Sequence, residues 1–254
     1  MIRQVNLILL EAGEVDSTGA ARLTGPRAVH ALDVLKVSAG QSLRIGLVDG
    51  PRGTGTVQAV DRGSVDLICA LESSIPERPR VDLLLAVPRP KVLRRLWAQL
   101  AALGVGRIVL TNAERVERPY FDTHVLTPDC YRPLLIEGLQ QAQDTRLSEV
   151  SIHRRFKVLV EDDLEALCGT GLRLAADPGG SVSVGAAVRD RVALDPGCRV
   201  LLAVGPEGGW NRFELDLLTA HGFTTTSMGP RTLRTDTACL ALLALIHDAM
   251  RRDE

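Results

Sequence analysis

Two loops rich in glycine and proline, near the C-terminus, constrain the fold of this chain more than any other feature. The first loop, residues 205–209 (GPEGG), follows an apolar run at 200–204, and the second, residues 228–234 (MGPRTLR), follows a short run that ends at Ser227. Each loop leads into a segment with helical spacing. In an α/β fold, loops that leave a strand and enter a helix meet at the carboxyl ends of the strands, where ligands bind. The two loops are therefore predicted to form one active site.

The first loop lacks the patterns of phosphate-binding loops. No Gly-Lys-Ser/Thr follows it, and it does not contain the GxGxxG pattern of dinucleotide-binding folds. Glu207 in its centre would repel a pyrophosphate, whereas a carboxylate suits a cationic or hydrogen-bond-donating ligand such as S-adenosylmethionine. A single loop of this kind is better explained as a turn that needs glycine for its backbone angles. Two such loops together weaken that explanation and favour a ligand site.

The helices after the two loops have marked starting points. Asn211 can cap the first helix, Glu214 three residues later completes a capping box, and Gly222 ends the helix. Thr235 is the expected cap of the final helix. The apolar stretch 238–246 must be buried on most sides, either in the core of the chain or in a dimer interface.

The rest of the chain divides into two regions of different periodicity. Residues 1–72 contain short alternating strands, turn signals and one helical segment, which predicts a small β-barrel domain of structural, oligomerisation or binding function. Residues 73–80 (SSIPERPR) are polar and proline-bearing, and we expect a linker there. Residues 81–254 alternate apolar strands with helices, which predicts an α/β domain with a mainly parallel sheet and helices on both faces.

Composition excludes several classes of protein. Of 30 basic residues three are lysines and the rest arginines, but the net charge is −1, so any nucleic-acid site must be a local patch. The five cysteines have no CxxC spacing, which argues against a disulfide framework and against a zinc site and indicates a reducing compartment. The longest apolar run, 238–246, is far shorter than the ~20 residues that span a membrane. We therefore expect a soluble, cytoplasmic protein without a bound metal.

The two loops resemble the paired signature of a known enzyme family. VGPEGGW followed by MGPRTLRTDTA resembles the GPEGG and LGxRILRxETA motifs of the RsmE-type 16S ribosomal RNA (uracil-N3)-methyltransferases of the SPOUT superfamily. Met228, Thr232 and Asp236 depart mildly from that pattern. More degenerate matches extend the resemblance over nearly the whole chain, at Leu103-Gly104-Val105, Glu114-Arg115, 141–146 (QAQDTR) and His30 with Val34-Leu35-Lys36.

The resemblance implies a PUA-like RNA-binding barrel followed by a SPOUT domain with a C-terminal trefoil knot. It also implies a homodimer that acts on 16S rRNA of the small ribosomal subunit. The implied cofactor is S-adenosylmethionine, bound by backbone groups of the knot loops. The cofactor-binding residues carried over are Ala176, Gly205, Pro206, Glu207, Gly208, Gly209, Ser227, Met228, Gly229 and Leu233.

The reaction that the resemblance implies suggests two catalytic residues. Methylation of uracil N3 removes the N–H proton, and a guanidinium near O2 or O4 would stabilise the anion that develops. Arg234 is the predicted guanidinium, and pairing with Glu207 or Asp236 to hold the loops is an equally good explanation of that arginine. Glu207 is a candidate proton acceptor, with a structural role as the alternative.

Candidate RNA contacts are His30 and Lys36 in the barrel and Arg115 and Arg146 in the second region, where solvated surface arginines are the alternative explanation. Three other functions remain open. The chain could methylate another RNA or another uridine, or it could be a non-catalytic RNA-binding protein with a degenerate knot. A Rossmann-fold methyltransferase is the third, and the absence of a glycine motif after an early strand disfavours it.

Overall fold

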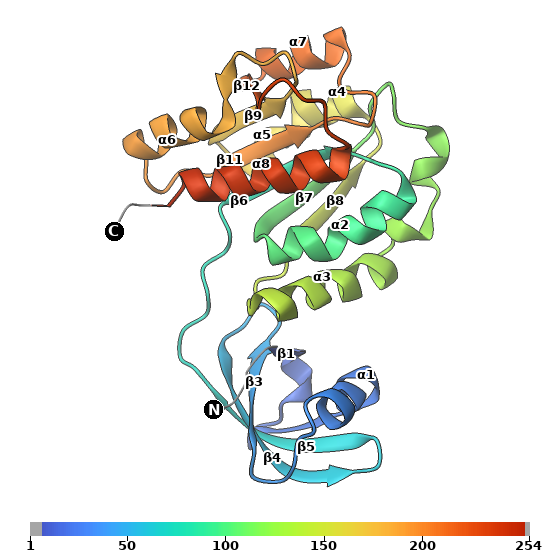
Figure 1. Cartoon of the computed structure of the whole chain (residues 1–254), viewed down its shortest axis with the longest axis vertical. Helices are drawn as coiled ribbons and strands as arrows, with labels where there is room; N and C mark the ends of the chain where they lie inside the picture. The colour runs from blue at the N-terminus through green and yellow to red at the C-terminus, as the bar shows by residue number, and fades with distance from the viewer. Residues whose placement is uncertain (1–6, 252–254) are drawn as a thin grey trace. The chain divides into compact units, whose positions relative to one another are not determined.

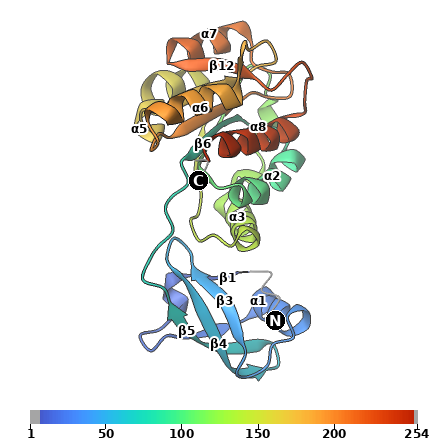
Figure 2. The same cartoon turned by 60° about the vertical axis from the view of Figure 1, so that its left-hand side comes forward.

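The computed structural model describes residues 7–251 of the 254-residue chain. The chain forms two compact units (Figures 1 and 2). The first unit comprises Met1–Arg78 and Ile136–Leu147, and the second comprises Pro79–Leu135 and Ser148–Glu254. The stretch between the last strand of the first unit and the first strand of the second, 72–80, contains no helix or strand, as expected for a linker.

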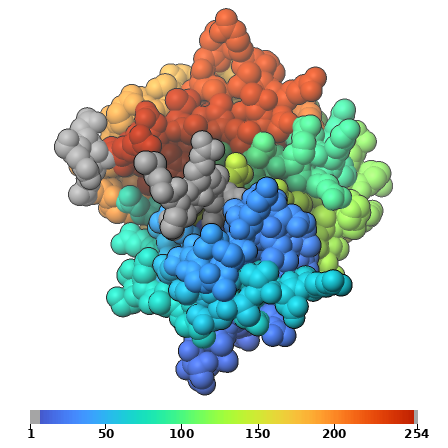
Figure 3. Space-filling view, turned by 60° about the horizontal axis from the view of Figure 1, so that its bottom comes forward, coloured from blue at the N-terminus to red at the C-terminus, as the bar shows by residue number. Residues whose placement is uncertain are grey.

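The first unit is a five-stranded sheet with a short helix. Its strands are β1 (Ile8–Leu10), β2 (Ala20–Leu23), β3 (Ser42–Leu47), β4 (Arg52–Asp61) and β5 (Ser64–Leu71), and the short helix is α1 (Gly25–Val29), continued by a π-helical turn, His30–Val34. The strand order is β1-β3-β4-β5-β2, with β1 parallel to β3 and the other pairs antiparallel. Side chains such as Leu23, Ile45 and Leu67 fill one apolar core. Figure 3 shows the blue and cyan surface of these strands.

A segment from the middle of the chain completes this first unit. The second half of α3 (Pro128–Ala142) and the residues after it lie against β1 and the β3–β4 turn. Gln140 accepts hydrogen bonds from the backbone N–H groups of Leu7 and Leu9, at 3.3 and 3.2 Å. The Thr145 hydroxyl donates to the carbonyl of Gly50 at 2.6 Å. The sequence places all of 81–254 in one domain, but these bonds satisfy backbone groups of the first unit and attach residues 136–147 to it.

The second unit is built on a parallel seven-stranded sheet with the order β10-β12-β9-β11-β6-β7-β8. The strands are β6 (Val81–Ala86), β7 (Val105–Thr111), β8 (Glu149–His153), β9 (Leu172–Ala176), β10 (Val182–Ser183), β11 (Val200–Val204) and β12 (Phe223–Ser227). Every residue of the central strands β6 and β11 is buried, which explains why both are apolar apart from Asp82 in β6.

Helices cover the sheet as the alternating pattern predicts. They are α2 (Pro90–Ala102), α4 (Phe156–Val158), α5 (Leu164–Cys168), α6 (Val184–Leu194), α7 (Arg212–Ala220) and α8 (Thr235–Ala249). The chain passes from β12, at the far side of β9, back to α8, which packs against β11, β6, α2 and α6 (Figure 1). The expected apolar helix therefore forms part of the core, and Cys239, Leu243 and Ile246 on it are fully buried.

Two further findings concern residues 7–251. No helix there is both long and apolar enough to cross a membrane. Over the same residues, no group of three or more histidine, cysteine or acidic side chains is arranged to hold a metal ion. The five cysteines are all unpaired.

Candidate functional site

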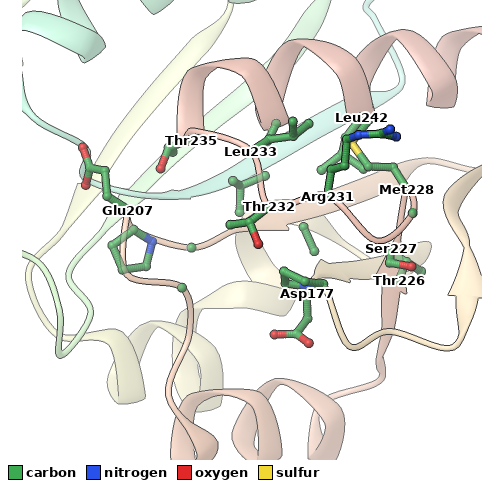
Figure 4. Close-up of a pocket in the computed structure, with 18 residues that line it drawn as sticks. Asp177, Glu207, Thr226, Ser227, Met228, Arg231, Thr232, Leu233, Thr235 and Leu242 are labelled. Atoms are coloured by element: carbon green, nitrogen blue, oxygen red, sulfur yellow. The ribbon is translucent and has the colours of Figure 1, made fainter.

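A pocket lies where three neighbouring parallel strands end. Because β9 is paired with both β11 and β12, the segments that follow these strands emerge at one edge of the sheet. The pocket is lined by residues 176–178 after β9, by the first glycine loop after β11, by the second glycine loop after β12, and by the first turns of α8 (Figure 4). The structure thus brings together the two loops that the sequence pairs, and adds a third.

Most of the cofactor-binding residues predicted from the sequence line this pocket. They are Ala176, Gly205, Pro206, Glu207, Gly209, Ser227, Met228, Gly229 and Leu233. Gly208 does not line it. Asp177, Thr226 and Leu242 also line it and were not predicted from the sequence, whereas Arg231 and Thr232, which line it too, belong to the predicted second loop. Asp177 directly follows Ala176, at the point where an apolar strand ends and the turn Asp-Pro-Gly-Gly begins. That pattern is the sequence signal that could have identified Asp177 as a lining residue.

The pocket combines apolar surfaces with two carboxylates. Leu233 and Leu242 supply apolar surface, and the carboxylates of Asp177 and Glu207 lie on different sides of the cavity (Figure 4). An oxygen of Asp177 accepts a hydrogen bond from the backbone N–H of Gly179 at 2.7 Å, which fixes that loop. Neither carboxylate forms an ion pair with any residue that the structure describes. The pocket is therefore suited to a ligand with apolar parts and a positive or hydrogen-bond-donating centre.

The side chain of Glu207 is hydrogen-bonded to the segment that follows β6, the strand paired with β11. One of its carboxylate oxygens accepts a hydrogen bond from the backbone N–H of Arg89 at 3.1 Å, just before α2 begins. Arg89 precedes a proline, so its extended backbone cannot continue a helix and its N–H is free to donate. The side chain of Glu207 thereby ties the first glycine loop to the end of β6 while remaining exposed at the pocket.

Two glycines of the first loop are required by its geometry. A Cβ atom on Gly205 would lie 3.1 Å from the backbone nitrogen of Trp210 and 3.2 Å from its indole ring. Gly209 has a φ of +73°, which side chains disfavour, and its surroundings are open. The loop therefore closes on Trp210, whose ring is buried and stacks near Phe156.

The predicted capping box holds this loop in place and does more than cap the helix. The side chains and backbone N–H groups of Asn211 and Glu214 exchange hydrogen bonds of 2.8 Å at the start of α7. Glu214 is also almost fully buried, and its second oxygen accepts from the backbone N–H of Glu114 at 2.7 Å. The neighbouring Arg115 donates through Nη1 to the carbonyl of Gly208. The Glu114-Arg115 pair thus clamps the glycine loop from the β7 side.

This clamp changes the interpretation of Arg115. We expected an RNA contact or a solvated arginine, but its guanidinium is bound to the backbone of the loop beside the pocket. A Cβ atom on Gly208 would lie 2.8 Å from Cδ of Arg115, which shows how closely the two segments approach.

Arg234 lies beside the pocket and not in its lining. It is the N-cap residue of α8, so the helix begins at Thr235 and Thr235 is not the cap as predicted. The expected acidic partners are engaged elsewhere, because Asp236 pairs with Arg95 at 2.9 Å and Glu207 accepts from Arg89. The Arg234 guanidinium is exposed and forms no ion pair within the described chain, so the loop-holding explanation of this arginine is not supported.

The remaining predicted residues lie in the first unit. Arg146 is half-buried and donates through Nη1 to the carbonyl of Asp49 at 3.1 Å, which gives it a structural role in joining residues 136–147 to this unit. His30 lines a cavity together with Arg27 and Gln140, and its buried Nε2 has no hydrogen-bond partner among residues 7–251. Lys36 is exposed and has a left-handed backbone, with a φ of +52°.

Comparisons with known proteins agree with the pattern of the loops. A family model described as an RNA methyltransferase domain matches residues 76–247. The chain is 31% identical over 248 residues to the Ribosomal RNA small subunit methyltransferase E of Treponema pallidum, an alignment that covers 95% of this chain and 90% of that protein. It is 23% identical to the protein of the same name from Bacillus subtilis, with 94% of each chain covered.

Two solved structures have the same fold. A Ribosomal RNA small subunit methyltransferase E from Neisseria gonorrhoeae, bound to S-adenosyl methionine, superposes with a TM-score of 0.74 at 19% identity and covers 96% of this chain and 97% of its own. A methyltransferase from Legionella pneumophila with bound SAM has a TM-score of 0.76 at 23% identity, covering 97% and 98%. The predicted fold, a small β domain followed by an α/β domain with a parallel sheet, is confirmed.

Proposed function

Because this chain belongs to the RNA methyltransferase family, we propose that it methylates N3 of a uridine in the 16S rRNA of the small ribosomal subunit, with S-adenosylmethionine as the methyl donor. The observation that carries the proposal is the pocket in which the loops after β9, β11 and β12 converge. The two relatives described above are named for small-subunit rRNA methylation, and two proteins of the same fold have the cofactor bound.

The residues present fit this cofactor. The bound cofactor supplies a methyl group on a positively charged sulfonium. The unpaired carboxylates of Asp177 and Glu207 give the pocket negative charge, and Leu233 and Leu242 give it apolar surface. Gly205 and Gly209 leave the backbone of the first loop open to close approach. A phosphate-bearing cofactor would meet the two carboxylates of Asp177 and Glu207 and only one guanidinium, that of Arg231, so the lining favours a cationic ligand over a phosphate.

Arg234 and Glu207 have distinct places in the proposed reaction. A uracil that loses its N3 proton gains negative charge on O2 and O4, and a guanidinium stabilises that charge if no other anion neutralises it. Arg234 meets this condition because it is exposed beside the pocket and has no acidic partner in the described chain. Glu207 is the candidate proton acceptor, because its carboxylate lines the pocket and only one of its oxygens is engaged by a backbone N–H.

The target base must leave any stacked or paired arrangement before its N3 atom can enter the pocket. A single-stranded or flipped uridine satisfies this requirement. We further propose that the enzyme acts in the cytoplasm as a homodimer, with α8 in the interface.

The decisive experiment compares isolated small ribosomal subunits with naked 16S rRNA as methyl acceptors, followed by primer extension to locate the product. Methylation at N3 blocks base pairing, so reverse transcription should stop at a single uridine. Methylation of a different RNA or of a different atom would favour the alternative methyltransferase. If calorimetry detects no binding of S-adenosylmethionine, the chain is a non-catalytic RNA-binding protein.

A further inference from the structure

Arginines at the amino ends of the strands of the seven-stranded sheet differ in their partners from arginines at the carboxyl ends. At the edge formed by the amino ends of the strands, Arg199 binds the buried Asp82 with both nitrogens, at 2.7 and 3.1 Å. Arg107 pairs with Glu149 at 3.0 Å and lies 3.9 Å from Asp82. Arg173 donates to backbone carbonyls. These guanidiniums are fully engaged in holding the fold, and none is left for an external anion.

At the opposite edge, where the pocket lies, several arginines are exposed and form no ion pair with any residue that the structure describes, Arg231 of the pocket lining included. We call three of them, which lie outside that lining, the arginine rim: Arg89 after β6, Arg118 after β7 and Arg234 before α8. No ion pair joins any of the three to another residue within 7–251. Uncompensated charges of one sign repel each other and destabilise the folded state, so this rim is unfavourable unless an anion binds it.

Hydrogen bonds connect the rim to the pocket. The backbone N–H of Arg89 donates to Glu207, which lines the pocket, so the backbone of Arg89 lies next to the pocket. The Arg89 guanidinium reaches the hydroxyl of Tyr120, which also donates to Glu117 at 2.9 Å. Arg118 lies between Glu117 and Tyr120 in the chain, on the one-turn 3₁₀ helix Arg118–Phe121. These contacts run outward from the pocket, along the edge of the sheet.

Arg234 extends the rim at the other end. It immediately precedes Thr235, and Figure 4 shows Thr235 on the same side of the pocket as Glu207. The ion pair between Arg95 and Asp236 holds the start of α8 against α2, the helix that begins directly after Arg89. The segments that carry Arg89 and Arg234 are therefore joined by an ion pair between α2 and α8.

We propose that Arg89 and Arg118 bind the phosphates of the RNA strand beside the target uridine and so align it with the pocket. This inference rests on the proposed function and assigns the RNA-binding surface of the second unit. Guanidiniums spaced along a surface match the repeated phosphates of an extended strand, whereas the pocket lining carries two carboxylates against the single guanidinium of Arg231. The pocket therefore takes the cofactor and base, and the rim takes the backbone.

The test measures binding of the full-length protein to transcribed 16S rRNA by filter binding across a series of KCl concentrations. The variants are R89S, R118S and the double variant. Each single variant should raise the Kd several-fold and reduce the slope of log Kd against log salt concentration by about 0.7, the value for one phosphate contact with a single strand. The double variant should reduce the slope by about 1.4. Calorimetric affinity for S-adenosylmethionine should not change.

The matched control is R189S on α6, because Arg189 is also exposed but lies outside the rim. Its Kd and salt slope should equal those of the wild type. The proposal is overturned if the double variant keeps the wild-type slope, or if R189S changes it as much. Because filter binding needs no turnover, a wild-type protein that binds RNA with the predicted slope but methylates nothing would refute the proposed activity and leave the rim intact.

Discussion

The buried carboxylate of Glu214 accepts a hydrogen bond from the backbone N–H of Glu114 at 2.7 Å, although 100 residues separate the two in sequence. Its other oxygen accepts from the backbone N–H of Asn211 at 2.8 Å. One side chain therefore joins the loop after β7 to the glycine loop after β11. The carboxylate is 3% exposed, and backbone donors replace the water that it loses on burial.

Replacement of Glu214 with Ala should strongly destabilise the fold. It leaves two backbone N–H groups without acceptors, and each buried donor left unsatisfied costs about 1–3 kcal/mol. We expect a loss of about 2–4 kcal/mol in the free energy of unfolding, measured by urea titration, with a smaller loss for E214Q because it keeps one acceptor oxygen. D216N on the same helix is the control, since the exposed pair of Asp216 with Arg212 contributes only about 0.5 kcal/mol. Equal losses for E214A and D216N would contradict the proposed clamp.

Substitutions at two glycines of the first loop, Gly205 and Gly208, should distinguish an effect of loop packing from an effect of losing any glycine. In G205A the new methyl group would press against Trp210, and overpacking of this kind costs about 1–3 kcal/mol. The Kd for S-adenosylmethionine should therefore rise about tenfold or more, as measured by calorimetry. G208A meets only the exposed side chain of Arg115, which can move, so its Kd should stay within about threefold of wild type. A similar weakening in both variants would show that the pocket does not depend on the contact with Trp210.

The sequence predicted those parts of the site that local patterns determine. Glycine loops, an asparagine cap and a glutamate three residues later are signals within one stretch of chain, and the capping box of Asn211 and Glu214 is confirmed. Parallel strands end at one edge, so the pairing of the two loops also followed from the strand-and-helix pattern.

The parts that the sequence did not predict depend on partners far away in the chain. Nothing near Arg115 or Arg146 indicates that the first binds the carbonyl of Gly208 and the second the carbonyl of Asp49. An arginine in a motif can bind RNA or its own backbone with the same five donors, and only the fold decides between them. For the same reason, the attachment of residues 136–147 to the first unit had no local signal.

Replacement of Arg146 should therefore lower the stability of the protein before it affects RNA binding. R146A removes a hydrogen bond to the carbonyl of Asp49 and the packing of a side chain that is only 18% exposed, so we expect a loss of about 1–3 kcal/mol in unfolding free energy. The control is R62A in the exposed turn between β4 and β5, with no expected loss beyond about 0.5 kcal/mol. If R146A instead keeps full stability and loses affinity for 16S rRNA, the original RNA-contact interpretation is correct.

Arg234 should act on turnover and leave the cofactor in place. Its guanidinium lies outside the pocket lining, so R234A should keep the Kd for S-adenosylmethionine within about twofold, while kcat falls by about 10²-fold or more, as for other lost oxyanion contacts. R234K tests geometry, because lysine keeps the charge but not the planar fork. Methylation of small subunits with labelled cofactor gives kcat, and calorimetry gives the Kd. Equal losses of cofactor binding and turnover would assign Arg234 to the structure of the loop.

His247 should make the stability of the protein depend on pH. Burial in α8 lowers the pKa of its imidazole, a hydrogen bond with the backbone of Leu103 opposes this shift, and its buried Nε2 has no partner. Both folded and unfolded chains hold a neutral ring above the unfolded pKa of about 6.5, so the stability is fully present there. Below that pH the unfolded chain binds a proton that the folded chain resists, and stability falls by up to about 1.4 kcal/mol per pH unit until the folded pKa is reached. Urea titrations at pH 7.5 and 5.5 should show a smaller loss in H247L than in the wild type, and identical losses would mean that His247 does not contribute.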